Sequence, residues 1–125
     1  MSVRDPVDLG YTRSKIGLWR GKLFAELGPH CIVCLEKGRK RGAIHLHEGI
    51  LWRSEVMGFS FPTRLRVFAD CNSFPVCGLC HKYAPPREWF FEWSCRRYGE
   101  QEVREWYASF NWKVPPDRRF MPDAD

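Results

Sequence analysis

Apolar residues first recur at helical spacing in residues 14–28. The recurring positions are three or four residues apart: Ile16, Trp19, Leu23 and Leu27. This spacing places apolar side chains on one face of an α-helix. Ser14 is suited to cap the start of this helix and Gly28 to end it. The pattern therefore predicts a helix here, preceded by a loose arm over residues 1–13.

Two further helices are predicted over residues 87–99 and 100–112. The first ends at a glycine, which suits a helix C-terminus. The second carries an apolar stripe formed by Val103, Trp106 and Phe110. The tryptophans of this region are therefore expected to pack between helices. The polar, proline-rich residues 113–125 are expected to form a mobile tail.

Alternation of apolar and polar residues, which is typical of a strand, occurs in residues 43–47. One face would carry Ile44 and Leu46, and the other His45 and His47. Residues 64–69 are the candidate for a second strand, and residues 36–42 form a basic, glycine-flanked turn. The two prolines at 85–86 interrupt any helix that begins near Gly78.

The composition indicates one small cytoplasmic domain. The chain has 125 residues, and its six Trp and nine Phe bury a large area from few side chains. It contains no apolar run close to the roughly 18 residues that cross a membrane. The N-terminus lacks the apolar segment of a secretory signal, so we expect a reducing, cytoplasmic location and no membrane contact.

Positive charge is concentrated in the N-terminal part of the chain. The net charge is +5, and residues 1–47 carry nine Lys/Arg against four Asp/Glu. Residues 88–125 carry six Lys/Arg against eight Asp/Glu. A positive field favours a polyanion such as nucleic acid as the partner.

Four of the six cysteines form two C-x-x-C pairs. These are Cys31 with Cys34 and Cys77 with Cys80. Two such knuckles complete a tetrahedral shell of thiolates around Zn²⁺, whose binding contributes roughly 10–16 kcal/mol of apparent folding free energy. Disulfides conflict with a reducing location, and a redox motif needs only one pair. Cys71 and Cys95 are left as ordinary, partly buried thiols.

Histidines and an asparagine accompany these pairs in a recognisable order. His47 and Glu48 follow the first pair, and the segment N-x4-C-x-x-C-H then runs from Asn72 to His81. This order resembles the zinc-bearing branch of the HNH endonucleases, over about residues 31–84. The resemblance implies an α+β fold in which a four-cysteine zinc site braces a ββα-metal centre. The N-terminal residues 1–30 and the helical residues 85–112 would flank this centre.

The resemblance also assigns roles to individual residues. His47 and His81 would bind a divalent ion such as Mg²⁺ or Mn²⁺, which polarises a phosphodiester. Asn72 would orient the general base.

The base itself has two candidates. Glu48 stands where the family usually has a histidine, and a free carboxylate is about two pKa units less basic than imidazole. In a regular strand Glu48 points away from His47, and only a kink at Gly49 would turn it inward. His45 shares a face with His47 and is the alternative base.

The expected function is hydrolysis of DNA by a small, phage-type endonuclease. Phosphate contacts are expected from five basic residues: Lys37, Arg39, Lys40, Arg41 and Arg53. We expect a monomer or weak dimer, in which residues 87–112 could receive a larger phage protein. The alternative function is a non-catalytic, zinc-ribbon-like adaptor that binds nucleic acid or a protein.

Overall fold

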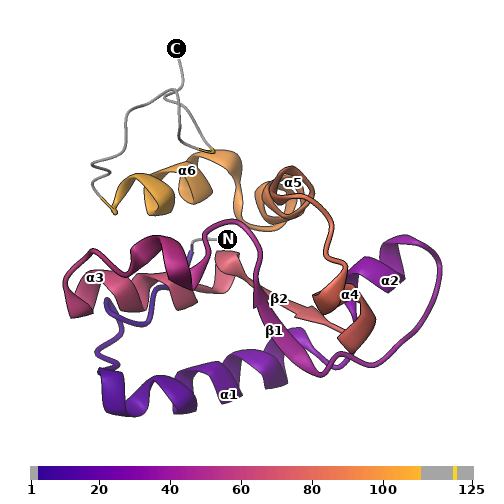
Figure 1. Ribbon diagram of the computed structural model, residues 1–125, viewed down its shortest axis with the longest axis horizontal. Helices are drawn as coiled ribbons and strands as arrows, with labels where there is room; N and C mark the ends of the chain where they lie inside the picture. The colour runs from indigo at the N-terminus through magenta and orange to yellow at the C-terminus, as the bar shows by residue number, and fades with distance from the viewer. Residues whose placement is uncertain (1–2, 111–119, 121–125) are drawn as a thin grey trace.

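Two short antiparallel strands lie at the centre of the molecule (Figure 1). The computed structural model describes residues 3–110 and residue 120. β1 spans His45–Glu48 and pairs with β2, which spans Ser73–Val76. The first residue of β1 lies opposite the last residue of β2, and the last residue of β1 lies opposite the first of β2.

Helices cover both sides of this sheet. Helix α1 (Ile16–Leu27) lies on one side, and helices α5 (Arg87–Tyr98) and α6 (Glu100–Ala108) lie on the other (Figure 1). The fold is therefore α+β, as the sequence predicts. Within the described residues, no helix combines the length and the apolar content that crossing a membrane requires.

β1 starts two residues later and ends one residue later than the predicted strand at 43–47. It begins at His45 and includes Glu48, so Ile44 lies outside it. Ile44 is 66% exposed, whereas Leu46 is buried, and the two do not share a covered face as expected. The remaining alternation holds, because His45 and His47 are more exposed than their strand neighbours.

The prediction of a second strand at residues 64–69 is wrong. That segment belongs to helix α3 (Phe61–Leu65) and the 3-10 turn that follows it, while β2 lies further along the chain. Pro62 favours the helix, because a proline in the first turn removes an N–H that has no helical partner there. Pro75 obscures β2 in the sequence. It is tolerated because each strand of a two-stranded sheet has one unpaired edge.

α1 is the helix that the N-terminal apolar spacing predicts. Trp19 and Leu23 are buried and pack on β1 in a small core of their own. Gly28 ends the helix as expected. Ser14 does not cap it, because a 3-10 turn at Arg13–Lys15 precedes the helix and moves its start beyond that serine.

The arm before α1 is held in place, contrary to the expectation of a loose segment. Arg4 pairs with the buried Asp70 (Nε to Oδ2, 3.2 Å). Asp5 is also buried and pairs with Arg66 (3.1 Å). Both partners lie just before β2, so the described part of the arm is tied to the centre of the fold.

The two predicted C-terminal helices are present and bury their apolar stripe, but α6 ends at Ala108, before the predicted end at residue 112. Gly99 separates α5 from α6 with a φ of +97°, a conformation that favours glycine. The stripe residues Val103, Trp106 and Phe110 are all buried. A partner docking on this region would have to use the other faces. Residues 111 and 112 of the predicted helix, and nearly all of the predicted tail, lie outside the described residues.

α5 packs directly against the turn that follows β1. Gly49 permits this contact, because a Cβ placed there would lie 2.5 Å from the Phe90 ring. Phe90 is completely buried and also packs on Phe74 of β2, with ring centroids 4.7 Å apart. Helix and sheet therefore share one core.

Candidate metal centre and adjoining cavity

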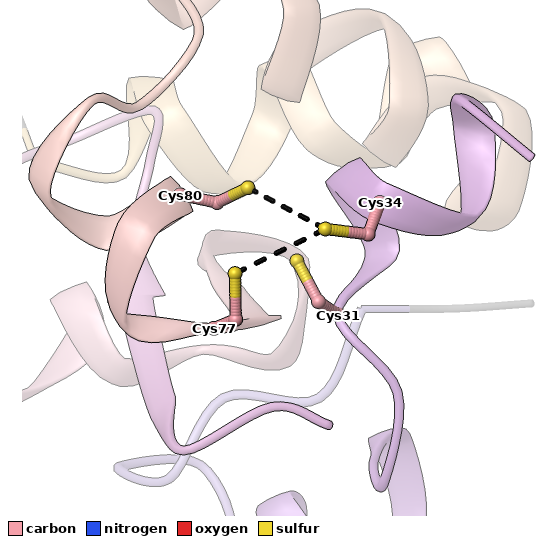
Figure 2. Close-up of side chains that lie close together, drawn as sticks. All are labelled: Cys31, Cys34, Cys77 and Cys80. Atoms are coloured by element: carbon pink, nitrogen blue, oxygen red, sulfur yellow. Dashed lines mark hydrogen bonds between the residues drawn. The ribbon is translucent and has the colours of Figure 1, made fainter. Parts of the chain in front are cut away.

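The two C-x-x-C pairs have the same local structure. Cys31 is the N-cap residue of helix α2 (Ile32–Glu36), and Cys77 is the N-cap residue of helix α4 (Gly78–Lys82). The second cysteine of each pair lies inside its helix. Figure 2 shows that all four side chains point toward one another from these two helix starts.

The four sulfur atoms form a closed cluster. They all lie within 4.8 Å of one another, and the Cys34 sulfur lies 3.9 Å from that of Cys77 and 3.8 Å from that of Cys80 (Figure 2). Zn–S bonds of about 2.3 Å in a tetrahedron place the sulfurs about 3.8 Å apart, whereas a disulfide bond is about 2.05 Å long. The cluster therefore fits a tetrahedral metal ion and contains no disulfide.

Burial in this cluster favours the neutral thiol over the thiolate. It raises the pKa of Cys34, and burial together with the neighbouring sulfurs raises the pKa of Cys80 to about 12. For Cys77, burial opposes ionisation, but hydrogen bonds from the Cys80 amide and the other thiols lower its pKa to about 6. Cys34 and Cys80 therefore resist ionisation, and a bound cation would be needed to hold them as thiolates.

The remaining two cysteines stand apart from the cluster. Cys71 is completely buried, and burial raises the pKa of its thiol well above the usual range. Cys95 is partly buried, and burial likewise raises the pKa of its thiol. Both raised pKa values favour the protonated, unreactive form.

Three imidazoles meet beside the cysteine cluster. His45 and His47 come from alternate positions of β1, and His81 directly follows Cys80 in α4. The His81 ring centroid lies 4.5 Å from that of His45, with nearly parallel rings, and 5.3 Å from that of His47, edge to face. This grouping follows from the strand pairing, because β2 runs into α4 beside the start of β1.

His47 and His81 are close enough to share one ion. A metal–nitrogen bond of about 2.1 Å puts an ion about 3.2 Å from each ring centre, so rings up to about 6.4 Å apart can hold it. The observed separation is 5.3 Å. The histidines nevertheless do not form a closed shell. In the described part of the chain, the cysteines are the only group of three or more metal-ligating side chains with atoms within 4.8 Å.

His47 is held more firmly than its two neighbours. It is half-buried, and its ring lies 5.1 Å from that of Phe90 in α5. Burial, together with the nearby His81, lowers the pKa of His47. The lowered pKa favours the neutral imidazole, which is the form that binds metal ions.

A cavity of about 510 Å³ adjoins the three histidines. Glu48 and two arginines line its other side, together with Trp52. The Glu48 carboxylate bonds to Arg53 Nε through one oxygen and lies 3.6 Å from Arg20 Nη2 through the other. Both guanidinium groups also lie over the Phe68 ring, at 5.1 Å for Arg20 and 4.9 Å for Arg53.

These contacts bear on the role expected of Glu48. β1 stays regular as far as Glu48, which pairs with Ser73, so Glu48 alternates with His47 as the strand pattern requires. Glu48 nevertheless lines the same cavity as His47, and its charge opposes the lowering of the His47 pKa. Glu48 is buried between two arginines, and its immediate effect is to position them.

Asn72 fixes the loop that follows β1. Its side-chain oxygen accepts hydrogen bonds from the backbone N–H groups of Ile50 and Leu51, both at 2.9 Å. Its NH₂ group donates to the carbonyl oxygens of Leu51 and Val67, both at 2.8 Å. These four bonds use the full capacity of the amide. Asn72 therefore has no bond left for Glu48 or His45, and it positions the cavity wall through the backbone.

The structure separates the five predicted phosphate contacts into two groups. Arg53 lines the cavity. The other four are exposed on the turn between α2 and β1 and do not line it: Lys37, Arg39, Lys40 and Arg41. Their contact with phosphate stays a prediction.

Arg20 and Trp52 are cavity residues that sequence reasoning missed. Arg20 belongs to α1, far from the cysteine pairs in the chain, and reaches the cavity only because α1 packs on the sheet. Trp52 lies four residues after Glu48 in a segment without periodicity. Nothing in the sequence around either residue indicates the site.

Comparisons with protein-family models, curated proteins and solved structures gave no significant match. The functional argument therefore depends on the geometry of the two clusters and the cavity.

Proposed function

We propose that the protein is a metal-dependent endonuclease that hydrolyses DNA phosphodiester bonds at a ββα-metal centre of the HNH type. The observation that carries this proposal is the approach of His47 and His81 to 5.3 Å beside a cavity that two arginines line. The chain order β1, β2, α4 supports it (Figure 1), with His47 in β1 and His81 in α4.

The two clusters suit different ions. The cysteine cluster is buried and offers four soft ligands, which suits a structural Zn²⁺. His47 and His81 offer two nitrogen ligands next to open space, so water or phosphate oxygens would complete the shell of Mg²⁺ or Mn²⁺. That cation would stabilise the negative charge that develops on the phosphate oxygens during hydrolysis.

The surrounding residues can supply the remaining steps. Glu48 is engaged by two arginines, whereas the exposed His45 stacks on His81 at 4.5 Å. These contacts favour His45 as the general base that takes a proton from the attacking water. The water oxygen bonds to phosphorus as the ester oxygen leaves. Arg20 and Arg53, held by Glu48, are placed to bind the phosphate.

Nicking of a supercoiled plasmid tests the proposal. Wild-type protein should nick DNA only when Mg²⁺ or Mn²⁺ is added, and His47→Ala and His81→Ala should each lower the rate about 1,000-fold or more. Zinc content and thermal midpoint should stay at wild-type values. His30→Ala is the matched control, because His30 is exposed and does not line the cavity. Nicking that survives both alanine substitutions would contradict the proposal.

The engagement of Glu48 also favours a second candidate. A carboxylate paired with two arginines is unsuited to proton transfer, as expected of a non-catalytic adaptor that binds nucleic acid. The same assay separates the candidates. DNA binding without nicking under any divalent ion would support the adaptor.

A further inference from the structure

Trp52 and Ile44 are the exposed apolar residues among those that line the cavity, and Trp52 brings a flat indole ring. Its side chain is large and apolar, yet the residue is 46% exposed. It lies on the same cavity as Arg20 and Arg53, whose guanidinium groups suit a phosphate. A wide aromatic ring therefore stands next to a cationic wall, in contact with solvent.

The Trp52 ring has a cation against one of its faces. The Arg87 guanidinium lies 3.7 Å from the ring centre, a cation–π contact at close range. Glu55 holds that arginine with a 2.8 Å bond and also accepts the backbone N–H of Trp52 at 2.9 Å. One carboxylate thus fixes both the backbone of the tryptophan and the cation that covers its ring. The position of the exposed Trp52 ring is therefore fixed by contacts to neighbouring residues.

An exposed aromatic ring beside phosphate-binding arginines matches the chemistry of an unpaired nucleotide. Bases stack on aromatic side chains while basic residues follow the backbone. In a duplex the flat faces of the bases are already covered by neighbouring bases, so the ring could reach only an unpaired or displaced base. We propose that Trp52 stacks on an unpaired base next to the phosphate held by Arg20 and Arg53. The preferred substrate is then single-stranded or locally unpaired nucleic acid.

This inference rests on the proposed function, because both place a backbone phosphate in the same cavity. Stacking itself needs no catalytic ion. Binding can therefore be measured without an added divalent cation and without a chelator, so that the cysteine-bound metal stays in place.

The experiment measures fluorescence anisotropy of three labelled probes: a short oligothymidylate, the same strand as a duplex, and an oligouridylate. The test substitutions are Trp52→Leu, which keeps bulk but removes the aromatic face, and Trp52→Phe, which keeps a smaller ring. Phe61→Leu is the matched control. Phe61 is an exposed aromatic residue that also contacts an arginine, Arg13 at 4.3 Å, but it does not line the cavity.

We expect Trp52→Leu to weaken single-strand binding about tenfold to a hundredfold and Trp52→Phe to lie between it and wild type. Duplex binding should change less than about threefold, because phosphate contacts dominate it. Equal losses with oligothymidylate and oligouridylate would assign the site to an unpaired base of either nucleic acid. A loss with only one of them would show that the site distinguishes the two strands by the sugar or by the thymine methyl group.

Three results would overturn the inference. They are equal weakening of single-strand and duplex binding, equal effects of Trp52→Leu and Trp52→Phe, and a loss in Phe61→Leu as large as in Trp52→Leu.

Plasmid nicking separates failure of this inference from failure of the proposed function. If nicking is absent while Trp52-dependent single-strand binding persists, the endonuclease proposal fails and the stacking surface stands. If nicking requires His47 and His81 but Trp52→Leu binds every probe normally, only the stacking surface fails.

Discussion

The cysteine cluster and the histidine cluster lie side by side but are built in opposite ways. The four sulfurs are buried and lie within 4.8 Å of one another. They can complete the coordination shell of a tetrahedral metal ion without any ligand from outside the protein. The histidines lie at the edge of a cavity, two of them exposed, and leave most of a metal shell to other ligands. A closed shell suits a structural ion, and an open one suits an ion that must meet a substrate.

The two clusters are also mechanically linked. Cys80 and His81 are consecutive residues of α4, so an ion bound by the four cysteines would also fix the position of His81. β1 forms the other side of the link, because it carries His45 and His47 and pairs with the strand that leads into α4. In the proposed endonuclease, the cysteines would set the geometry and the histidines would provide the chemistry. The two roles can be tested separately.

The largest expected effect is loss of the whole fold when a cysteine ligand is removed. Cys34→Ser should abolish most of the roughly 10–16 kcal/mol that metal binding contributes, which exceeds the total stability of many small domains, about 5–15 kcal/mol. Circular dichroism and zinc content should both show the loss. Cys95→Ser is the control, because Cys95 is partly buried outside the cluster and should leave both measurements unchanged. A folded, metal-free Cys34→Ser protein would contradict the structural role.

The next effect should separate the two candidate bases. His45→Ala should lower the nicking rate about 100-fold to 10,000-fold, the usual contribution of a general base. Glu48→Gln should mainly weaken substrate binding, because it disturbs Arg20 and Arg53 and leaves the proposed base His45 in place. Steady-state kinetics would show a fall in kcat for the first variant and a rise in KM for the second. The reverse pattern would make Glu48 the base.

Asn72 should contribute to stability, although it lies near the cavity. Asn72→Ala would leave four backbone groups without a partner in a buried place, at a cost of about 1–3 kcal/mol for each group that water cannot reach. We expect a loss of about 3 kcal/mol or more in urea denaturation. Ser73→Ala is the control, because that buried hydroxyl makes its shortest bond to Ala69 (2.9 Å) and should cost about 1 kcal/mol. Similar losses in both variants would mean that the amide network has little effect.

Asp70 should give the fold a pH dependence that involves neither cluster. Burial raises the pKa of this carboxyl above its ordinary value of 3.8, although Arg4 opposes the shift. The folded state then holds the proton more tightly than the unfolded state. Its contribution is fully present below the ordinary pKa and is lost as pH rises through the raised one, at no more than about 1.4 kcal/mol per pH unit.

Urea denaturation of wild type and Asp70→Asn at several pH values tests this sign. The difference between the two proteins cancels the pH dependence of metal binding, which they share. The stability of Asp70→Asn relative to wild type should increase as pH rises through the window just above 3.8. Asp8→Asn, at an exposed carboxyl, is the control. A constant difference between wild type and Asp70→Asn would contradict the prediction.

The smallest effects should come from the exposed turn between α2 and β1. Replacing Arg39 or Lys40 by Ala should weaken binding to all DNA sequences alike. It should also lower the slope of log affinity against log salt by about 1 for each phosphate that the protein no longer neutralises. Stability should not change, because both side chains are exposed. Lys15→Ala is the control, since Lys15 is exposed beside α1. An unchanged salt slope would exclude the turn from the binding surface.

The cysteine cluster was predictable because its signal is local. Each C-x-x-C pair places its two sulfurs on one helix start, and only the meeting of the two pairs needed the fold. The position of His81 beside this cluster was predictable as well, because it directly follows Cys80 in the chain. The interruption of the helix after His81 was also predictable, because α4 ends at Lys82, before the two prolines.

The parts that the sequence did not predict depend on tertiary packing or on short elements. Arg20 enters the cavity from α1, and no local pattern links that helix to β1. β2 contains Pro75, which lowers its strand signal, and α2 has only five residues, too few for a helical period. The side on which Glu48 lies could be predicted only from the register of β1, which the pairing with β2 sets.

The contact between Gly49 and Phe90 limits how the molecule can be divided. The region with HNH-like residues ends before α5, yet the Phe90 ring lies against both the backbone after β1 and the His47 imidazole. Residues 31–84 are therefore not expected to keep the geometry of this site when they are grafted alone into another protein. A host protein would have to supply an aromatic ring at the same place, or the imidazole would lose the surface against which it rests.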